Sequence, residues 1–151
     1  MDKLTPEMIT QLTERPFPFV ERMGLKALEL KPGLVRLMVP IAGNGNHIGS
    51  MYAGALFTLA EIPGGALFMT TFDVSMFYPV VKEMTIRFKR PVTTDAFIEM
   101  RINEIEAARI AKEAEKNGKS EFILEGQITD ANNQVMAESR GVYQIRRYME
   151  K

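Results

Sequence analysis

The chain has 151 residues, with nineteen basic and nineteen acidic side chains, one histidine and no cysteine. Its balanced charge provides no bulk field that would attract nucleic acid or an anionic lipid surface. The absence of cysteine excludes disulfides, iron–sulfur clusters and thiol nucleophiles, and with a single histidine we expect no structural metal and no resident cofactor.

The N-terminal segment begins with a helix signal. Thr5 precedes Pro6, which suits an N-cap followed by the first helical position. The prolines at 16 and 18 are expected to end this helix and to continue as an extended or turn segment. Residues 1–20 thus form a helix and an extended lead-in to one domain that spans residues 1–151. No signal peptide is predicted, so the expected location is cytoplasmic.

Two short strands and a long helix are predicted next. The strands cover residues 25–30 and 34–39, and a loop follows over 40–46. Residues 51–70 form a helix that is apolar on most sides, which is typical of a buried helix. Glu61 and Pro63 interrupt it, so it is a core helix and not a membrane span, and Pro63 should loosen it just past Glu61.

The second half of the chain reads as a meander of four strands after a loop at 72–79. The patterns cover residues 83–89, 97–102, 122–129 and 135–145. Residues 104–116 are ambiguous, because their composition favours a helix while Asn117-Gly118 is typical of a hairpin turn. We interpret 97–116 as one long, bent strand.

These elements predict an α+β fold in which a curved antiparallel sheet wraps around one central helix. A single apolar helix cannot bury itself, and a curling sheet solves that problem. The exposed sheet face and edges then favour contact with a second copy of the chain.

Two segments resemble a known family. The first combines Asn46 with the run from Tyr52 through Gly54 to Glu61, and the second is the strand that ends in Arg90-Pro91-Val92. Over residues 25–145 the chain resembles the PaaI-like thioesterases of the hotdog fold and a related hotdog family of unknown function. The chain differs from the family pattern at three positions: Tyr52 replaces the family's His, Ala53 its first Gly and Glu61 its Asp.

The resemblance implies hydrolysis of acyl-coenzyme A or acyl-carrier thioesters. The backbone N–H of Gly54 would polarise the thioester carbonyl at the start of the helix. Glu61 would act from the opposite subunit as general base or nucleophile. The expected assembly is a homodimer or a dimer of dimers.

Further residues have two interpretations each. Asn46 would bond the carbonyl or a water, or else shape its loop, and Tyr52 would orient the carbonyl or pack at the interface. His47 is expected to be a loop residue. Three cations would either bind the phosphates of coenzyme A or lie on a solvated strand edge: Lys89, Arg90 and Arg109. Candidates for the acyl pocket or, failing that, for the core are Phe57 and Phe77.

The main alternative is a hotdog protein that binds acyl thioesters without hydrolysing them, since the family His is replaced. A dehydratase is less favoured, because that chemistry in the fold usually pairs a catalytic His with a carboxylate, and the only His of this chain, His47, lies in a Gly/Asn loop outside the helix that resembles the family. A DNA-binding regulator would need an added basic segment, which the residues before Leu25 do not supply. No nucleic-acid or membrane partner is expected.

Overall fold

The computed structural model describes residues 4–149. Its helices and strands, in chain order, are α1 (Pro6–Glu14), α2 (Pro18–Met23), β1 (Lys26–Lys31), β2 (Leu34–Val39), α3 (Ala53–Thr71), β3 (Phe77–Phe88), β4 (Ala96–Arg101), α4 (Glu104–Asn117), β5 (Lys119–Thr129) and β6 (Val135–Arg147).

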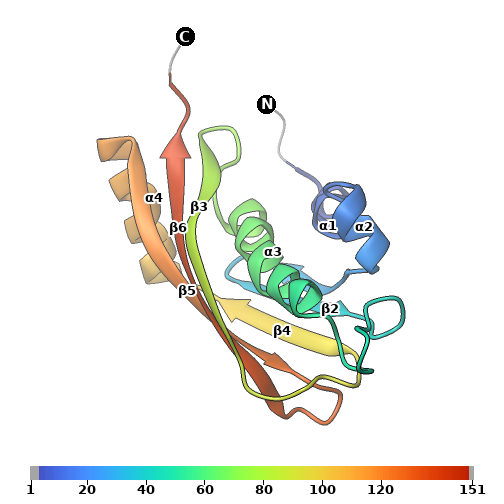
Figure 1. The fold of residues 1–151 in the computed structure, drawn as a ribbon. Coiled ribbons are helices and arrows are strands. Elements are labelled where there is room, and N and C mark those ends of the chain that lie inside the picture. Colours follow the sequence, from blue (N-terminus) through green and yellow to red (C-terminus); the bar gives the residue numbers. More distant parts are fainter. Residues whose placement is uncertain (1–3, 150–151) are drawn as a thin grey trace.

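The six strands form one antiparallel sheet in the order β1-β2-β4-β5-β6-β3. The sheet bends around α3, while α1 and α2 lie on the side of α3 away from β6 and α4 flanks β5 (Figure 1). The predicted α+β arrangement is confirmed. The predicted four-strand meander is wrong, because β3 pairs with β6 at the edge instead of with β4.

Helix α3 is buried because its apolar residues cover most of its circumference. Leu59, Ala60 and Leu67 are almost fully buried against the inner face of the sheet. The helix continues through Pro63 to Thr71 without a break. By length and hydropathy α3 could cross a membrane, yet half of it is buried inside the domain, as in the core helix of a soluble protein.

The predicted long strand over 97–116 is wrong, because β4 ends at Arg101 and α4 follows. The Asn103 side chain caps α4 by accepting a hydrogen bond from the Glu106 N–H at 2.8 Å. Gly118 ends it in the left-handed conformation, with φ of 81°, and donates to the Ala114 carbonyl. Asn-Gly therefore ends a helix here, because glycine after a helix accepts the same backbone conformation as glycine in a hairpin turn.

Two further boundaries differ from prediction. The segment after Pro16 forms the short helix α2, which begins at Pro18 and ends at the left-handed Gly24. Strand β3 begins at Phe77, inside the predicted loop. The cap at Thr5 is confirmed, since its hydroxyl accepts from the Met8 N–H at 3.2 Å.

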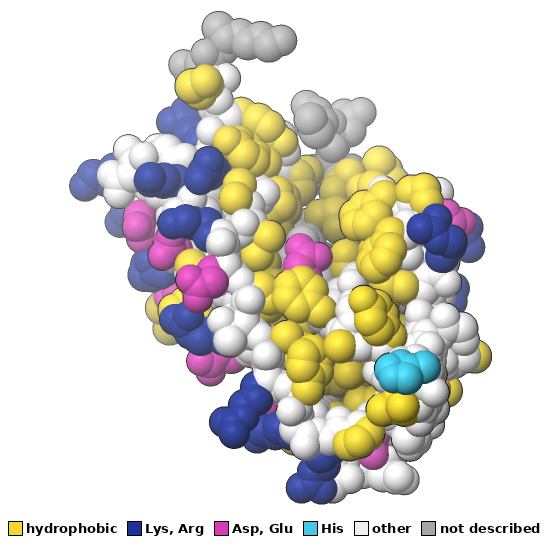
Figure 2. Space-filling model, viewed as in Figure 1, with side chains coloured by type: hydrophobic (Ala, Val, Ile, Leu, Met, Phe, Trp, Pro, Cys, Tyr) yellow, Lys and Arg dark blue, Asp and Glu magenta, His cyan; other side chains and the backbone are white. Residues whose placement is uncertain are grey.

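Strand β3 forms a long edge of the sheet and is open to solvent. Its inward-facing residues include Val81 and Phe88, yet these side chains are 42% and 47% exposed because no strand lies beyond them. Figure 2 shows hydrophobic side chains gathered over β3, α3 and the α1–α2 region, with acidic atoms in the middle of this face. The chain itself thus leaves apolar side chains of this face uncovered.

The space between the second half of α3 and the sheet is filled by aromatic rings. Tyr143 stacks on Phe122, which contacts Phe72, and Phe72 stacks on Phe68, with ring centroids 5.9–6.1 Å apart. Gly64 of α3 lies directly against the Tyr143 ring, where a Cβ would collide with Cζ and the hydroxyl. The neighbouring Gly65 faces the other way, and a Cβ there would meet nothing within 4 Å.

The paired glycines give opposite predictions for stability. Gly64→Ala should lower the free energy of unfolding by about 1–3 kcal/mol, because the buried Tyr143 ring must move. Gly65→Ala should raise it by roughly 0.5–1 kcal/mol, because alanine restricts the unfolded chain and meets no obstacle. Urea denaturation of the three proteins measures both changes, and a Gly64→Ala variant as stable as the wild type would contradict the packing described.

Candidate functional site

The loop before α3 is held rigid by two asparagines. The buried Asn44 amide donates to the carbonyls of Met23 and Pro40, both at 2.8 Å. The Asn46 side-chain oxygen accepts from the N–H groups of Ile48 and Ser50, and its nitrogen donates to the Ser50 hydroxyl at 3.0 Å. The structure thus supports the loop-shaping interpretation of Asn46, whose amide is already engaged inside the loop.

Helix α3 begins with two backbone donors that have no acceptor. Tyr52 is the N-cap and its carbonyl accepts from the N–H groups of Ala55 and Leu56. The N–H groups of Ala53 and Gly54 have no partner within residues 4–149. Unpaired N–H groups at a helix start favour an oxygen that carries negative charge.

The aromatic ring of Tyr52 lies against Gly54. A Cβ on Gly54 would collide with Cε1 of this ring, so no larger residue fits here without moving Tyr52. Tyr52 is 59% exposed, and its hydroxyl makes no hydrogen bond to the described part of the chain. Gly54 therefore has a packing role beside Tyr52 as well as an open N–H.

Glu61 is a half-buried carboxylate on an apolar helix. No donor or cation within residues 4–149 pairs with its side chain. Burial raises the pKa of Glu61 above its ordinary value of 4.5, and no ion pair opposes this shift. A carboxylate left unpaired in an apolar setting is a candidate for proton transfer, because its basicity is increased.

Tyr143 is a neighbour of Glu61 that the sequence did not single out. Its hydroxyl donates to the backbone carbonyl of Glu61 at 3.3 Å. Burial, and next the negative charge of Glu61, raise the pKa of Tyr143, so it stays a neutral phenol. The period-two pattern of residues 135–145 places Tyr143 on the same face of the strand as Ala137 and Ile145, but nothing in the sequence indicates its contact with Glu61.

The two candidate acyl-pocket phenylalanines have different environments. Phe57 lies one turn before Glu61 on α3 and is 39% exposed, so it can contact a ligand. Phe77 is 2% exposed and belongs to the core at the start of β3. The structure therefore brings Phe57, but not Phe77, to the surface beside Glu61.

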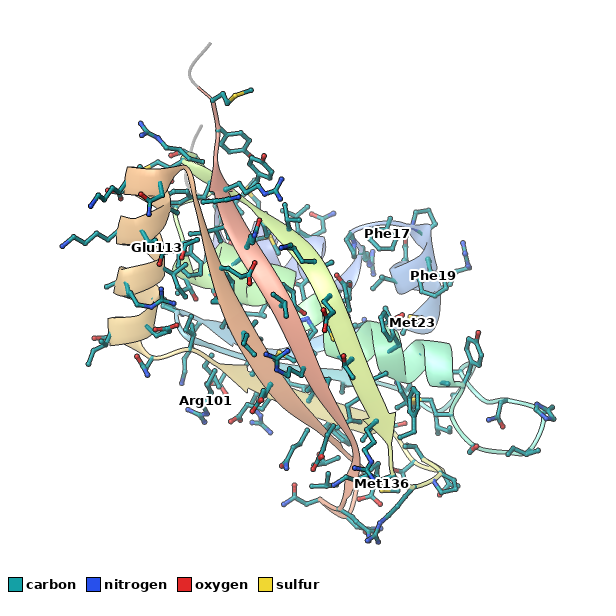
Figure 3. The ribbon with its side chains drawn as sticks, turned by 60° about the vertical axis from the view of Figure 1, so that its left-hand side comes forward. Phe17, Phe19, Met23, Arg101, Glu113 and Met136 are labelled. Atoms are coloured by element: carbon teal, nitrogen blue, oxygen red, sulfur yellow. The ribbon has the colours of Figure 1, made fainter. Side chains whose placement is uncertain are left out.

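The three candidate phosphate-binding cations are also separated. Arg109 pairs with Glu106 and Glu113 on α4 at 2.6 and 2.7 Å. Figure 3 shows α4 with Glu113 at the flank of the sheet and α3 on the far side of the strands, so Arg109 lies away from the site. Lys89 follows β3 and pairs with Glu138 at 2.7 Å, and Arg90 is exposed next to it.

Two hollows on the protomer lie away from Glu61. One of about 910 Å³ lies on the outer face of the sheet, among charged side chains such as Arg36 and Glu99 that pair with one another. Another of about 360 Å³ lies between α1 and β1. Neither hollow is lined by Glu61 or Gly54, which are both partly exposed. No three His, Asp or Glu side chains of residues 4–149 gather as metal ligands.

The raised pKa of Glu61 predicts a pH-dependent cost in stability. The folded chain holds this proton more tightly than the unfolded chain, so the free energy of unfolding falls as the pH rises above 4.5 and through the folded pKa. Glu61→Gln removes this penalty, and its melting temperature should exceed that of the wild type near about pH 8 and converge with it in acid. Thermal melts across pH measure this, with Glu125→Gln on the outer face as control. A variant less stable than the wild type at about pH 8 would contradict the prediction.

Comparisons with known proteins agree with this architecture. A structure from Pseudomonas aeruginosa, a protein of unknown function named PA5026 and "Probable Thioesterase", shares 54% identity, with 96% of this chain and 97% of that chain covered and a TM-score of 0.93. A protein of unknown function from Chlorobaculum tepidum shares 20% identity, with coverage of 97% and 99% and a TM-score of 0.82. Thioesterase HI1161 from Haemophilus influenzae shares 16% identity, with coverage of 99% and 95% and a TM-score of 0.75.

No curated protein matches the chain. A family model described as a domain of unknown function, DUF4442, matches residues 5–144, which is nearly the whole chain. The structural neighbours include thioesterases, and the curved sheet around α3 is the hotdog fold that the sequence predicted. This chain thus belongs to the DUF4442 family and is a hotdog protein of the thioesterase type.

Proposed function

We propose that the protein hydrolyses acyl thioesters of coenzyme A or of an acyl carrier. The observation that supports this most is Glu61, a half-buried carboxylate without a partner and with a raised pKa, on a helix that begins with open N–H groups. The 54% identical neighbour is named a probable thioesterase, which agrees with the proposal. The reaction uses no metal or cofactor beyond the thioester itself, and the proposed location is the cytoplasm.

The proposed site needs two copies of the chain. Gly54 and Glu61 are seven residues apart on α3, a separation of about 10 Å along the helix axis. A carbonyl oxygen bound by the Gly54 N–H is therefore too far from the Glu61 carboxylate of the same helix. Two antiparallel α3 helices around a twofold axis would bring Gly54 of one copy to Glu61 of the other.

The edge strand supports such a dimer. Strand β3 is twelve residues long, has no neighbour beyond it and exposes Val81 and Phe88 on its inner side. Long apolar edge strands favour pairing with another strand. Pairing of β3 with its counterpart would extend the sheet and place the two α3 helices side by side.

In the proposed reaction, water attacks the carbonyl carbon while Glu61 takes a proton from it. The oxyanion accepts a hydrogen bond from the Gly54 N–H at the start of the partner helix, where the helix dipole favours negative charge. The carbon–sulfur bond then breaks and the departing sulfur takes the proton, so the products are a carboxylic acid and a thiol. A direct attack by Glu61 through an anhydride is the nucleophilic version of the same step.

A second function, binding without hydrolysis, is favoured by one observation. The Tyr52 ring lies against Gly54, at the position where the resembling thioesterases have His. If this ring keeps the carbonyl away from the Gly54 N–H, the thioester would bind without being polarised. The two functions are distinguished by thiol release.

Glu61→Gln should lower the rate of thioester hydrolysis by about a hundred- to ten-thousand-fold, because a general base is lost with little change in shape. Tyr52→Phe should change the rate much less, since a neutral hydroxyl contributes on the order of 1 kcal/mol. Release of coenzyme A from a panel of acyl-coenzyme A substrates measures both. Equal rates for Glu61→Gln and the wild type would remove Glu61 from the mechanism, and binding without any thiol release would favour the second function.

The wild type should be a dimer or a dimer of dimers at micromolar concentration. Val81→Glu should shift it toward the monomer, because a charge on the inner side of the β3 edge opposes association. Ile123→Glu is the matched control, since Ile123 is 50% exposed on the outer side of β5. Light scattering measures the masses, and a folded wild-type monomer would contradict the two-copy site.

A further inference from the structure

Gly65 has no reason within the protomer to be glycine. It lies inside α3, where glycine costs stability relative to alanine, yet a Cβ would meet nothing within 4 Å. Its neighbour Gly64 differs, because the buried Tyr143 ring occupies the space of its Cβ. The gap at Gly65 is therefore available to something outside the chain.

The gap lies beside the unpaired carboxylate. Gly65 follows Glu61 by four residues, so the two share one side of α3 and both are partly exposed. Phe57, four residues before Glu61 on the same side of α3, carries a large aromatic ring. A group bound at Glu61 thus has open surface toward the C-terminal end of α3 and an obstacle toward its N-terminal end.

A partner helix does not account for the gap. In the proposed antiparallel pair, Gly54 of one copy lies opposite Glu61 of the other. Gly65, four residues after Glu61, then lies opposite Ser50 of the other copy, which is four residues before Gly54. Ser50 precedes the start of α3. Gly65 lies past the end of the helix–helix contact, so close approach of two helices does not require a glycine there.

We propose that Gly65 determines acyl-chain specificity by leaving a path for a medium-length acyl chain along α3. This inference rests on the proposed function and names its substrate class. The path runs from Glu61 over Gly65 to Met69, about 12 Å by the rise of the helix. Its surroundings, such as Ile62 and Met69, are apolar and suit an alkyl chain, whereas the amides of the coenzyme A arm would lack hydrogen-bond partners there.

The experiment compares kcat/KM for acetyl-, octanoyl- and palmitoyl-coenzyme A in the wild type, Gly65→Ala and Gly65→Val. The wild type should prefer octanoyl-coenzyme A. Gly65→Ala, which adds one carbon, should lower the ratio of octanoyl to acetyl turnover by roughly 10–200-fold, the range for a methylene-sized change in an apolar pocket, and Gly65→Val, which adds three carbons, should lower it further. Ala108→Val, on the exposed side of α4, is the control and should leave the ratio unchanged.

Three results would overturn the proposal. An equal loss for every acyl length would place the coenzyme A arm, not the acyl chain, over Gly65. Dissociation of Gly65→Val in light scattering would assign the glycine to contact between copies. An unchanged ratio would show that no chain passes there.

If the wild type hydrolyses none of these substrates, the proposed hydrolysis fails while the specificity is still tested. Calorimetry with the same three thioesters should then show that Gly65→Val weakens binding of octanoyl- more than acetyl-coenzyme A. Equal weakening, or no binding of any thioester by the wild type, would overturn the inference.

Discussion

The burial of α3 against the curved sheet is the interaction on which the rest of the structure depends. The helix is apolar on nearly all sides, but six strands can cover only part of its circumference. The uncovered side is where Gly54, Glu61 and Gly65 lie, each at least partly exposed. A carboxylate held on such a surface is stripped of part of its hydration, which raises its pKa and makes it a better base.

The sequence predicts this central arrangement well because the signals are local and strong. The period-two pattern of residues 122–129 and 135–145 predicts the inward faces of β5 and β6. Glu61 is the one charged residue in the apolar segment 51–70, and this predicts that its carboxylate has a specific role. The prediction was wrong where one sequence motif is compatible with two structures. The main case is Asn117-Gly118, which ends α4 instead of forming a hairpin turn.

The remaining features of the site depend on contacts between distant parts of the chain, which single-sequence patterns do not encode. The neighbour of Glu61 is Tyr143, eighty-two positions away. The pairing of β3 with β6 arises from the topology of the sheet, and it makes β3 an edge. Likewise, Gly64 and Gly65 look equivalent in the sequence, and only the position of the Tyr143 ring shows that one packs inward while the other faces open space.

Tyr52 stands where the resembling family has a His, so the side chain beside Gly54 is different while the Gly54 N–H is retained. A histidine would offer a polar nitrogen near the carbonyl, whereas Tyr52 presents an aromatic face to Gly54 and an exposed hydroxyl to solvent. An exposed side chain can change rotamer at little cost, because it gives up few contacts. The Tyr52 ring can therefore turn away from Gly54 without disturbing the core, so this residue is compatible with the proposed hydrolysis and with the alternative of binding alone.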